Sequence, residues 1–170
     1  MTTDESAAMT DLYLVVQWLH VLSATVLFGT GIGIAFFLWA AHLGGDVATI
    51  AGVSRLVVRA DWIFTATAGI VQPLSGALLI RLGGWDPHED WLLLTYAIYG
   101  LAFLCWAPVV WLQLRIRDMA TAALRDGTAL PPLYYTYIRR WFLLGWPAFI
   151  GLLLVFWLML AKAVPGAEPL

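Results

Sequence analysis

Three side chains within the apolar segments of this chain have the chemistry to bind a ligand or to move a proton: His20, Asp61 and Gln72. A neutral imidazole offers one hydrogen-bond donor and one acceptor, so His20 suits ligation of a haem iron, proton transfer or hydrogen bonding to a ligand. The alternative is a structural histidine that is hydrogen-bonded to Gln72 or to a neighbouring carbonyl group. The sequence leaves both interpretations open.

The carboxyl group of Asp61 lies near the start of an apolar segment, shortly after Arg59. An unpaired carboxylate inside a membrane is costly, so we expect Asp61 to pair with an arginine. The arginines within plausible reach are Arg59, Arg115, Arg117, Arg139 and Arg140. The alternative is a proton or ion site at Asp61, although the sequence supplies no second carboxylate for a di-acid cation site.

No catalytic set is recognisable in the chain, and the question of enzyme activity stays open. Cys105 is the only cysteine, which excludes an internal disulfide bond and a cysteine-built metal site. Gly29, Gly31 and Gly33 have a spacing similar to that of a dinucleotide-binding loop, but no strand precedes them, so we reject that interpretation. Catalytic residues are therefore unknown.

The elements that carry these polar residues are expected to be membrane spans. The chain of 170 residues is 62% hydrophobic and 12% charged, whereas soluble domains carry about a quarter charged residues. This composition predicts an integral membrane protein whose first partner is the lipid bilayer. The net charge of −2 and the lack of a basic block exclude nucleic acid as a partner. Association with another membrane subunit or with a second copy stays open.

Four apolar segments are long enough to cross a bilayer, because a helix of about 20 residues spans a hydrocarbon core of about 30 Å. They cover residues 12–41, 57–82, 91–115 and 134–163. The sequence therefore predicts an all-α fold, a polytopic four-helix membrane bundle that forms one domain over residues 1–170. Pro73, Pro108 and Pro147 fall inside three of these segments and predict kinked helices.

Basic residues flank the four segments unequally. One side has Arg55, Arg59, Arg115, Arg117, Arg125, Arg139 and Arg140, and the other has only Arg81 and Lys162. The positive-inside rule places the first group in the cytoplasm and both termini in the periplasm. At 1.5 Å per residue, His20 and Gln72 then lie about 12 and 15 Å below the outer end, so they could face each other. We predict an interior seam formed by His20, Asp61, Thr65 and Gln72.

Several segments of the chain together resemble a bacterial family of predicted integral membrane proteins that share a domain of unknown function. The resemblance is carried by LHVLSATVLFGTGIGIAFF from Leu19, RADWIFTATAGIVQPLSG from Arg59, PVVWLQLRIRDMA from Pro108, LPPLYYTYIRRWFLLGWPAF from Leu130 and FWLMLAK from Phe156. It covers nearly the whole chain. It implies a multi-pass protein of the bacterial inner (plasma) membrane, and it implies no activity.

The LHV pattern from Leu19, followed by small residues and a Phe-Gly pair, is similar to membrane proteins of the copper-resistance and protoporphyrinogen-oxidase type. That similarity implies a bundle of four or more helices with an early intramembrane histidine, and the oxidase type implies haem. Only His20 carries over from this pattern. The similarity therefore implies haem b as a cofactor, with His20 as the ligand of the haem iron.

Three functional hypotheses follow. The first is a haem- or porphyrin-associated redox protein, in which His20 binds the cofactor and Gln72 supports it. The second is a carrier of protons or small solutes that uses the seam between Asp61 and Gln72. The third is a non-catalytic membrane assembly subunit, which needs only surfaces of small residues for helix packing.

Overall fold

The computed structural model describes residues 3–164, with side chains from residue 7 onward. Its elements are α1 (Thr3–Gly44), α2 (Val47–Ala60), the π-helical turn η1 (Asp61–Thr65), α3 (Ala66–Gly83), α4 (Asp90–Asp126) and α5 (Pro132–Ala161). Because α2, η1 and α3 follow one another without a break, four helices are long and apolar enough to cross a membrane. The predicted all-α, four-span fold is confirmed for these residues.

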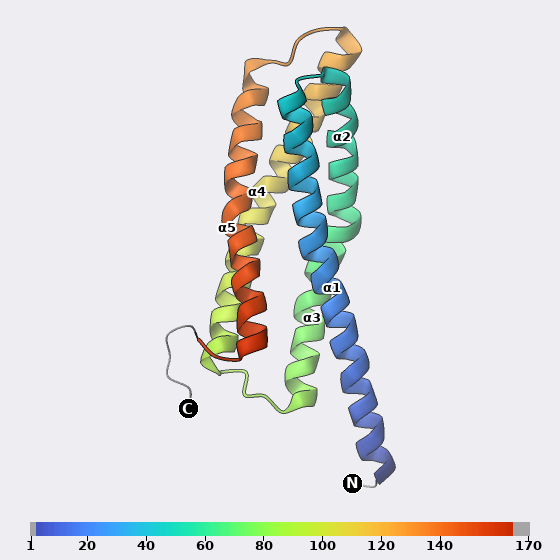
Figure 1. The fold of residues 1–170 in the computed structure, drawn as a ribbon, viewed down its shortest axis with the longest axis vertical. Coiled ribbons are helices and arrows are strands. Elements are labelled where there is room, and N and C mark those ends of the chain that lie inside the picture. Colours follow the sequence, from blue (N-terminus) through green and yellow to red (C-terminus); the bar gives the residue numbers. More distant parts are fainter. Residues whose placement is uncertain (1–2, 165–170) are drawn as a thin grey trace.

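The two ends of the bundle differ in charge and in the segments they hold (Figure 1). The short connections 45–46 and 127–131 lie at one end, and the connection 84–89 lies at the other, together with the start of α1 and the end of α5. We call the first the arginine end, because the basic residues of α2, of the second half of α4 and of the start of α5 lie toward it. Arg81 and Lys162 close α3 and α5 at the other end, the terminal end.

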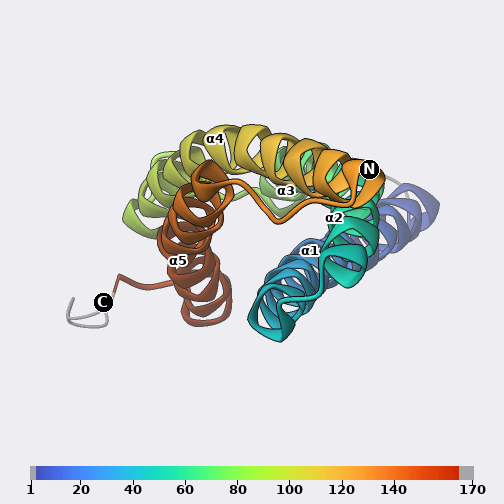
Figure 2. The same ribbon diagram turned by 90° about the horizontal axis from the view of Figure 1, so that it is seen from above.

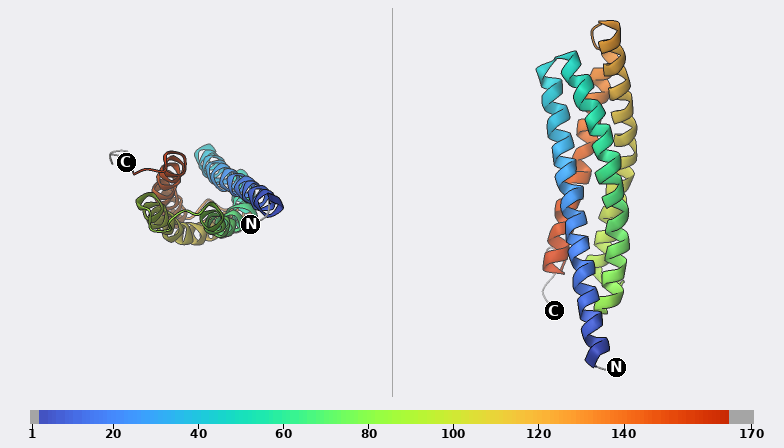
Figure 3. Two further views of the ribbon diagram at one scale, coloured as in Figure 1. Left: turned by 90° about the horizontal axis from the view of Figure 1, so that it is seen from below. Right: turned by 90° about the vertical axis from the view of Figure 1, so that its right-hand side faces the viewer.

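Seen from above, the helices follow an arc in the order α1, α2 with α3, α4 and α5 (Figure 2). The view from below shows the same arc, with α1 and α5 at its two ends (Figure 3). Aromatic rings join these two helices across the opening. Phe28 stacks on Phe149 with 5.1 Å between ring centroids, and Trp39 stacks on Phe142 at 4.1 Å. The opening between the ribbons is thus bridged by side chains at two levels.

Helices extend beyond the expected spans at the arginine end. α2 begins well before the expected start at residue 57, because Asp46 caps its first turn. The Asp46 carboxylate accepts hydrogen bonds from the backbone N–H and the hydroxyl of Thr49, at 2.7 and 2.6 Å. α4 continues past residue 115 because apolar residues at helical spacing keep one face buried. These residues are Ile116, Ala120 and Ala123.

The larger of the two hydrophobic clusters lies at the arginine end. Its fully buried members include Leu38 on α1, Ile50 on α2, Ile116 on α4 and Tyr134 on α5, so four elements meet there. A smaller cluster at the terminal end contains Trp91, Leu92 and Leu158. Much of the remaining apolar surface is exposed in the isolated chain, as is expected for helices whose outer faces meet lipid.

Candidate functional site

The three residues singled out in the sequence lie at two levels of the same long helix pair. His20 is on α1, Gln72 is on α3, and Asp61 begins the π-helical turn η1. Asp61 and Gln72 are separated by about 16 Å along the helix axis at 1.5 Å per residue. They therefore belong to two polar clusters, which we describe in turn.

His20 is held by a serine of α3. Its Nδ1 lies 2.7 Å from the Ser75 hydroxyl oxygen, which also donates a hydrogen bond to the carbonyl of Val71 at 2.7 Å. A hydroxyl group has one proton, and we assign the Ser75 proton to the Val71 carbonyl, so that the oxygen accepts from the Nδ1–H of His20. On this assignment the lone pair of the imidazole is on Nε2.

The imidazole of His20 packs directly against the backbone of α3. A Cβ atom at position 76 would stand 3.4 Å from Cε1 of His20, so Gly76 leaves the space that the ring occupies. A larger side chain than that of alanine at this position would meet the imidazole on the face that α1 covers. Sequence reasoning missed Ser75, although it follows Gln72 by three residues and therefore shares its side of the helix.

Gln72 does not share a side-chain hydrogen bond with His20. Its side-chain oxygen Oε1 is buried and has no hydrogen-bond partner among the described residues. The expectation that both residues lie at the same level is consistent with the hydrogen bond from His20 to Ser75, one turn further along α3. The imidazole of His20 is nevertheless hydrogen-bonded to Ser75, and the side-chain oxygen of Gln72 has no partner among the described residues.

Asp61 lies in a buried network of neutral hydrogen-bond donors. Its side chain is 3% exposed. The indole N–H of Trp106 donates to Oδ1 at 3.3 Å. With the amide of Gln113 oriented to satisfy both neighbours, its nitrogen donates to Oδ2 of Asp61 at 3.0 Å and its oxygen accepts from Trp141 at 3.3 Å. Residues of η1, α4 and α5 thus converge on one carboxyl group.

The arginine pairing expected for Asp61 is not found. Among the described residues the ion pairs are Arg117 with Asp118, Arg125 with Asp126 and His88 with Asp86, and none involves Asp61. Residues two positions apart on a helix do not face each other, so Arg59 points away to the exposed side while Asp61 points inward. Trp106 and Gln113 donate to the Asp61 carboxyl group where an arginine was expected.

The π-helical turn begins at Asp61 itself. The N–H of Ala66 bonds to the carbonyl of Asp61, five residues earlier, instead of four. Such a turn inserts one residue into a helix and occurs frequently at functional sites. The inserted residue rotates the buried face of α3 about the helix axis relative to the buried face of α2. Asp61 can therefore face α4 while later residues of the same continuous helix face α1.

Polar groups continue along α3 between the two clusters. The hydroxyl of Ser23 donates to the carbonyl of Ala68 at 3.2 Å, and the hydroxyl of Tyr99 donates to the carbonyl of Gly69 at 2.6 Å. The buried hydroxyl of Thr65 lies beside the Asp61 carboxyl group, one turn earlier in the helix. Ser23, which shares the face of His20 on α1, and Tyr99 on α4 thus add polar contacts between the two clusters, and sequence reasoning did not identify Tyr99.

Comparisons with known proteins identify the chain by family. No curated protein and no solved structure matches it. One family model, described as predicted integral membrane protein (DUF2269), matches residues 14–163. The match covers most of the chain and agrees with the resemblance of its sequence segments. The chain therefore belongs to this family of predicted integral membrane proteins.

Proposed function

We propose that this membrane protein carries protons, alone or together with a small solute, and that Asp61 is the group that binds the proton. The observation that supports this function best is the burial of the Asp61 carboxyl among neutral donors. A carboxylate that is kept permanently charged within a membrane is normally paired with a cation. Trp106 and Gln113 instead offer hydrogen bonds without a compensating charge. Such a carboxyl group suits the uptake and release of a proton.

The polar seam supports a path toward the terminal end. Gln72 holds a buried side-chain oxygen without a partner among the described residues, and such an atom in a native protein calls for an explanation such as a bound water or a functional role. The hydrogen-bonded pair of Ser75 and His20 follows next along α3. Histidine can accept and release protons near neutral pH, which suits the outer part of such a path.

The proposed orientation follows from charge. The arginine end holds most of the basic residues, and cytoplasmic flanks of membrane spans are enriched in arginine and lysine. We therefore place the arginine end in the cytoplasm of a bacterial cell and the protein in its inner membrane. Asp61 then lies nearer to the cytoplasm and His20 nearer to the periplasm.

Proton flux in proteoliposomes tests the proposal. A pH-sensitive dye is enclosed, and a potassium gradient with valinomycin drives protons inward. We expect flux above that of empty liposomes, and its loss in Asp61→Asn. The matched control is Asp86→Asn, which removes an exposed carboxylate of the connection 84–89 and leaves flux unchanged. Equal flux for wild type and Asp61→Asn, or no flux in wild type under any gradient tested, would falsify the proposal.

A second candidate, a haem- or porphyrin-associated redox protein, is favoured by the geometry of His20. Histidines that bind metals usually donate the other ring N–H to a fixed partner, as Nδ1 does to Ser75. Of the residues in this cluster, only His20 offers a nitrogen that could bind a haem iron. His42, the other histidine of α1, lies about 33 Å further along the helix at 1.5 Å per residue. His20 would therefore be the one histidine of α1 that could hold haem b at this level of the bundle.

Absorbance decides between the two candidates. The haem function predicts a Soret band after haem is added to the purified protein, lost in His20→Leu and kept in His42→Leu. Absence of the band in wild type excludes this candidate and leaves the proton function untouched.

A further inference from the structure

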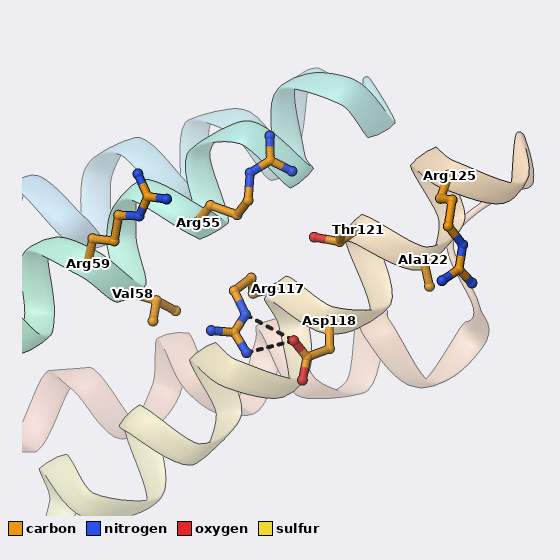
Figure 4. A pocket seen from close by; sticks show the side chains of 8 residues that line it. All are labelled: Arg55, Val58, Arg59, Arg117, Asp118, Thr121, Ala122 and Arg125. Atoms are coloured by element: carbon orange, nitrogen blue, oxygen red, sulfur yellow. Dashed lines mark hydrogen bonds and ion pairs between the residues drawn. The ribbon is translucent and has the colours of Figure 1, made fainter.

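An open cleft lies between α2 and α4 at the arginine end, away from both polar clusters. Its volume is about 380 Å³. The lining residues that carry charge or a hydroxyl group are Arg55, Arg59, Arg117, Asp118, Thr121 and Arg125. Figure 4 shows Arg55, Val58 and Arg59 on α2 and the other five lining residues on the neighbouring α4. Four cations thus surround a concave surface that holds one carboxylate.

The carboxylates near the cleft are already engaged by their neighbours in the sequence. Asp118 accepts two hydrogen bonds from Arg117, at 2.7 and 2.9 Å, and Asp126 accepts two from Arg125, at 2.8 and 3.1 Å. These pairs leave Arg55 and Arg59 without a carboxylate partner among the described residues. The two lie four residues apart on α2 and therefore on the same side of the helix.

Two other cations of the protein lie over aromatic rings. Arg115 lies over the ring of Trp111 at 5.5 Å from its centroid, and Lys162 lies over Trp85 at 3.9 Å. Aromatic faces attract cations, so these two charges have an internal partner. Within the part of the chain that the structure describes, Arg55 and Arg59 have neither a carboxylate nor a ring as a partner, so their donors are available to an anion.

We propose that this cleft binds a phosphate-bearing anion, with Arg55 and Arg59 as its main ligands. The guanidinium group presents N–H donors in a planar fork that matches two phosphate oxygens. The Thr121 hydroxyl adds a donor from the opposite wall. Concave surfaces lined by one sign of charge concentrate the field on a bound ion. The volume lies within the range of about 300–1,000 Å³ typical of small-ligand sites.

The phosphate has two sources that share this chemistry. The cleft is at the end of membrane helices, and the apolar side chain of Leu56 beside Arg55 is 63% exposed, so a lipid headgroup can enter while its chains contact α2. The cleft is also open and not enclosed, so a soluble phosphate can enter. The experiment therefore has one arm for each source.

The first arm offers phosphatidylglycerol, mixed with phosphatidylcholine in vesicles, to the purified full chain and counts retained lipid by native mass spectrometry. The second arm titrates inorganic phosphate into the protein in phosphatidylcholine nanodiscs and follows binding by phosphorus NMR. We expect wild type to bind one of these probes. Binding of phosphatidylglycerol alone identifies a lipid headgroup, and binding of inorganic phosphate identifies a soluble ligand.

Matched double variants assign the binding to the cleft. Arg55→Gln with Arg59→Gln is expected to weaken binding at least about tenfold, because each basic residue near an anionic group contributes separately. Arg81→Gln with Lys162→Gln removes the same charge from the terminal end, outside this cleft and outside the one lined by Arg139 and Arg140, and is expected to stay within about twofold of wild type. Should the first double variant fail to fold, the single variants Arg55→Gln and Arg59→Gln replace it, each with a measurable loss. Equal losses in both double variants, or no preference of wild type for either probe, would overturn the proposal.

Discussion

The hydroxyl of Tyr99 on α4 donates a hydrogen bond of 2.6 Å to the backbone carbonyl of Gly69 on α3. Gly69 lies four residues before Pro73, and proline has no N–H with which to continue the helical ladder. The carbonyl that the proline leaves without its helical donor is therefore satisfied by a side chain from the neighbouring helix. This is how α3 keeps its proline without an unpaired carbonyl in an apolar environment.

Tyr99→Phe tests this relationship. The substitution leaves the Gly69 carbonyl without a donor, and we expect a loss of about 1 kcal/mol in the free energy of unfolding. In Pro73→Ala the alanine N–H can bond to Gly69, so the same tyrosine substitution should cost less. Unfolding in mixed detergent, followed by circular dichroism, measures all four members of this cycle. An equal cost in both backgrounds would show that Tyr99 acts independently of the proline.

The hydrogen bond from His20 to Ser75 predicts which ring nitrogen carries the proton. Neutral His20 should be protonated at Nδ1, since the Ser75 proton goes to Val71. Nitrogen NMR of ring-labelled histidine at alkaline pH reads the tautomer, with His20→Leu used to assign the signal. We expect Ser75→Ala to shift the proton toward Nε2. Thr67→Ala, which removes a hydroxyl bonded within the same long helix, is the control. An unchanged tautomer in Ser75→Ala would contradict the assignment.

Gly76 predicts a second, steric effect on the same imidazole. A Cβ at this position would lie 3.4 Å from Cε1 of His20, so Gly76→Ala is at the limit of tolerance and Gly76→Leu must displace the ring. We expect Gly76→Leu to move the His20 nitrogen signals and to lower the unfolding midpoint. Gly52→Leu on α2, where a Cβ meets nothing within 4 Å, is the comparison. Unmoved His20 signals in Gly76→Leu would show that the ring does not rest on position 76.

The parts of the fold that depend on local composition could be predicted from the sequence. Four long apolar segments and the segregation of arginines are properties of the chain itself, and both are found. The extension of α2 and α4 beyond the expected spans differs from the prediction, because charged residues such as Arg117 favour a connection, whereas Ile116 and Ala120 keep a buried helical face. That prediction gave more weight to the number of charged residues than to the helical spacing of the apolar residues.

The partners of the site residues were harder to predict, because they come from distant parts of the chain. The expected pairing of Asp61 rested on arginines close in sequence or in level, whereas the actual donors Trp106 and Gln113 reach it from α4. The π-helical turn leaves no recognisable signal in the apolar run that follows Asp61. Pro73 indicates that the carbonyl of Gly69, four residues earlier, needs a hydrogen-bond donor. Which residue supplies that donor depends on the packing of α4 on α3, so Tyr99 could not be named from the sequence.

The N-terminal cap of α2 gives a pH dependence outside the membrane spans. Hydrogen bonds from Thr49 hold the pKa of Asp46 below its ordinary value. A lowered pKa in the folded state means that the cap stabilises the fold above the unfolded-state pKa and that this contribution is lost as pH falls through the folded-state pKa. Asp46→Ala should therefore lower the unfolding midpoint at pH 7, and the difference from wild type should shrink in acid. A difference that stays constant with pH would contradict a role for the ionised cap.

The hydrogen bond between Asp61 and Gln113 is expected to stabilise the fold through burial, since both side chains are 3% exposed. Gln113→Leu leaves one carboxyl oxygen of Asp61 without a donor, and we expect a loss of about 1–3 kcal/mol in the free energy of unfolding. In Asp61→Leu the same substitution should cost much less, because no buried acceptor is left unpaired. Gln17→Leu, on the exposed face of α1, is the matched control and should change little. Additive losses across the cycle would mean that Gln113 supports Trp141 and not the carboxyl group.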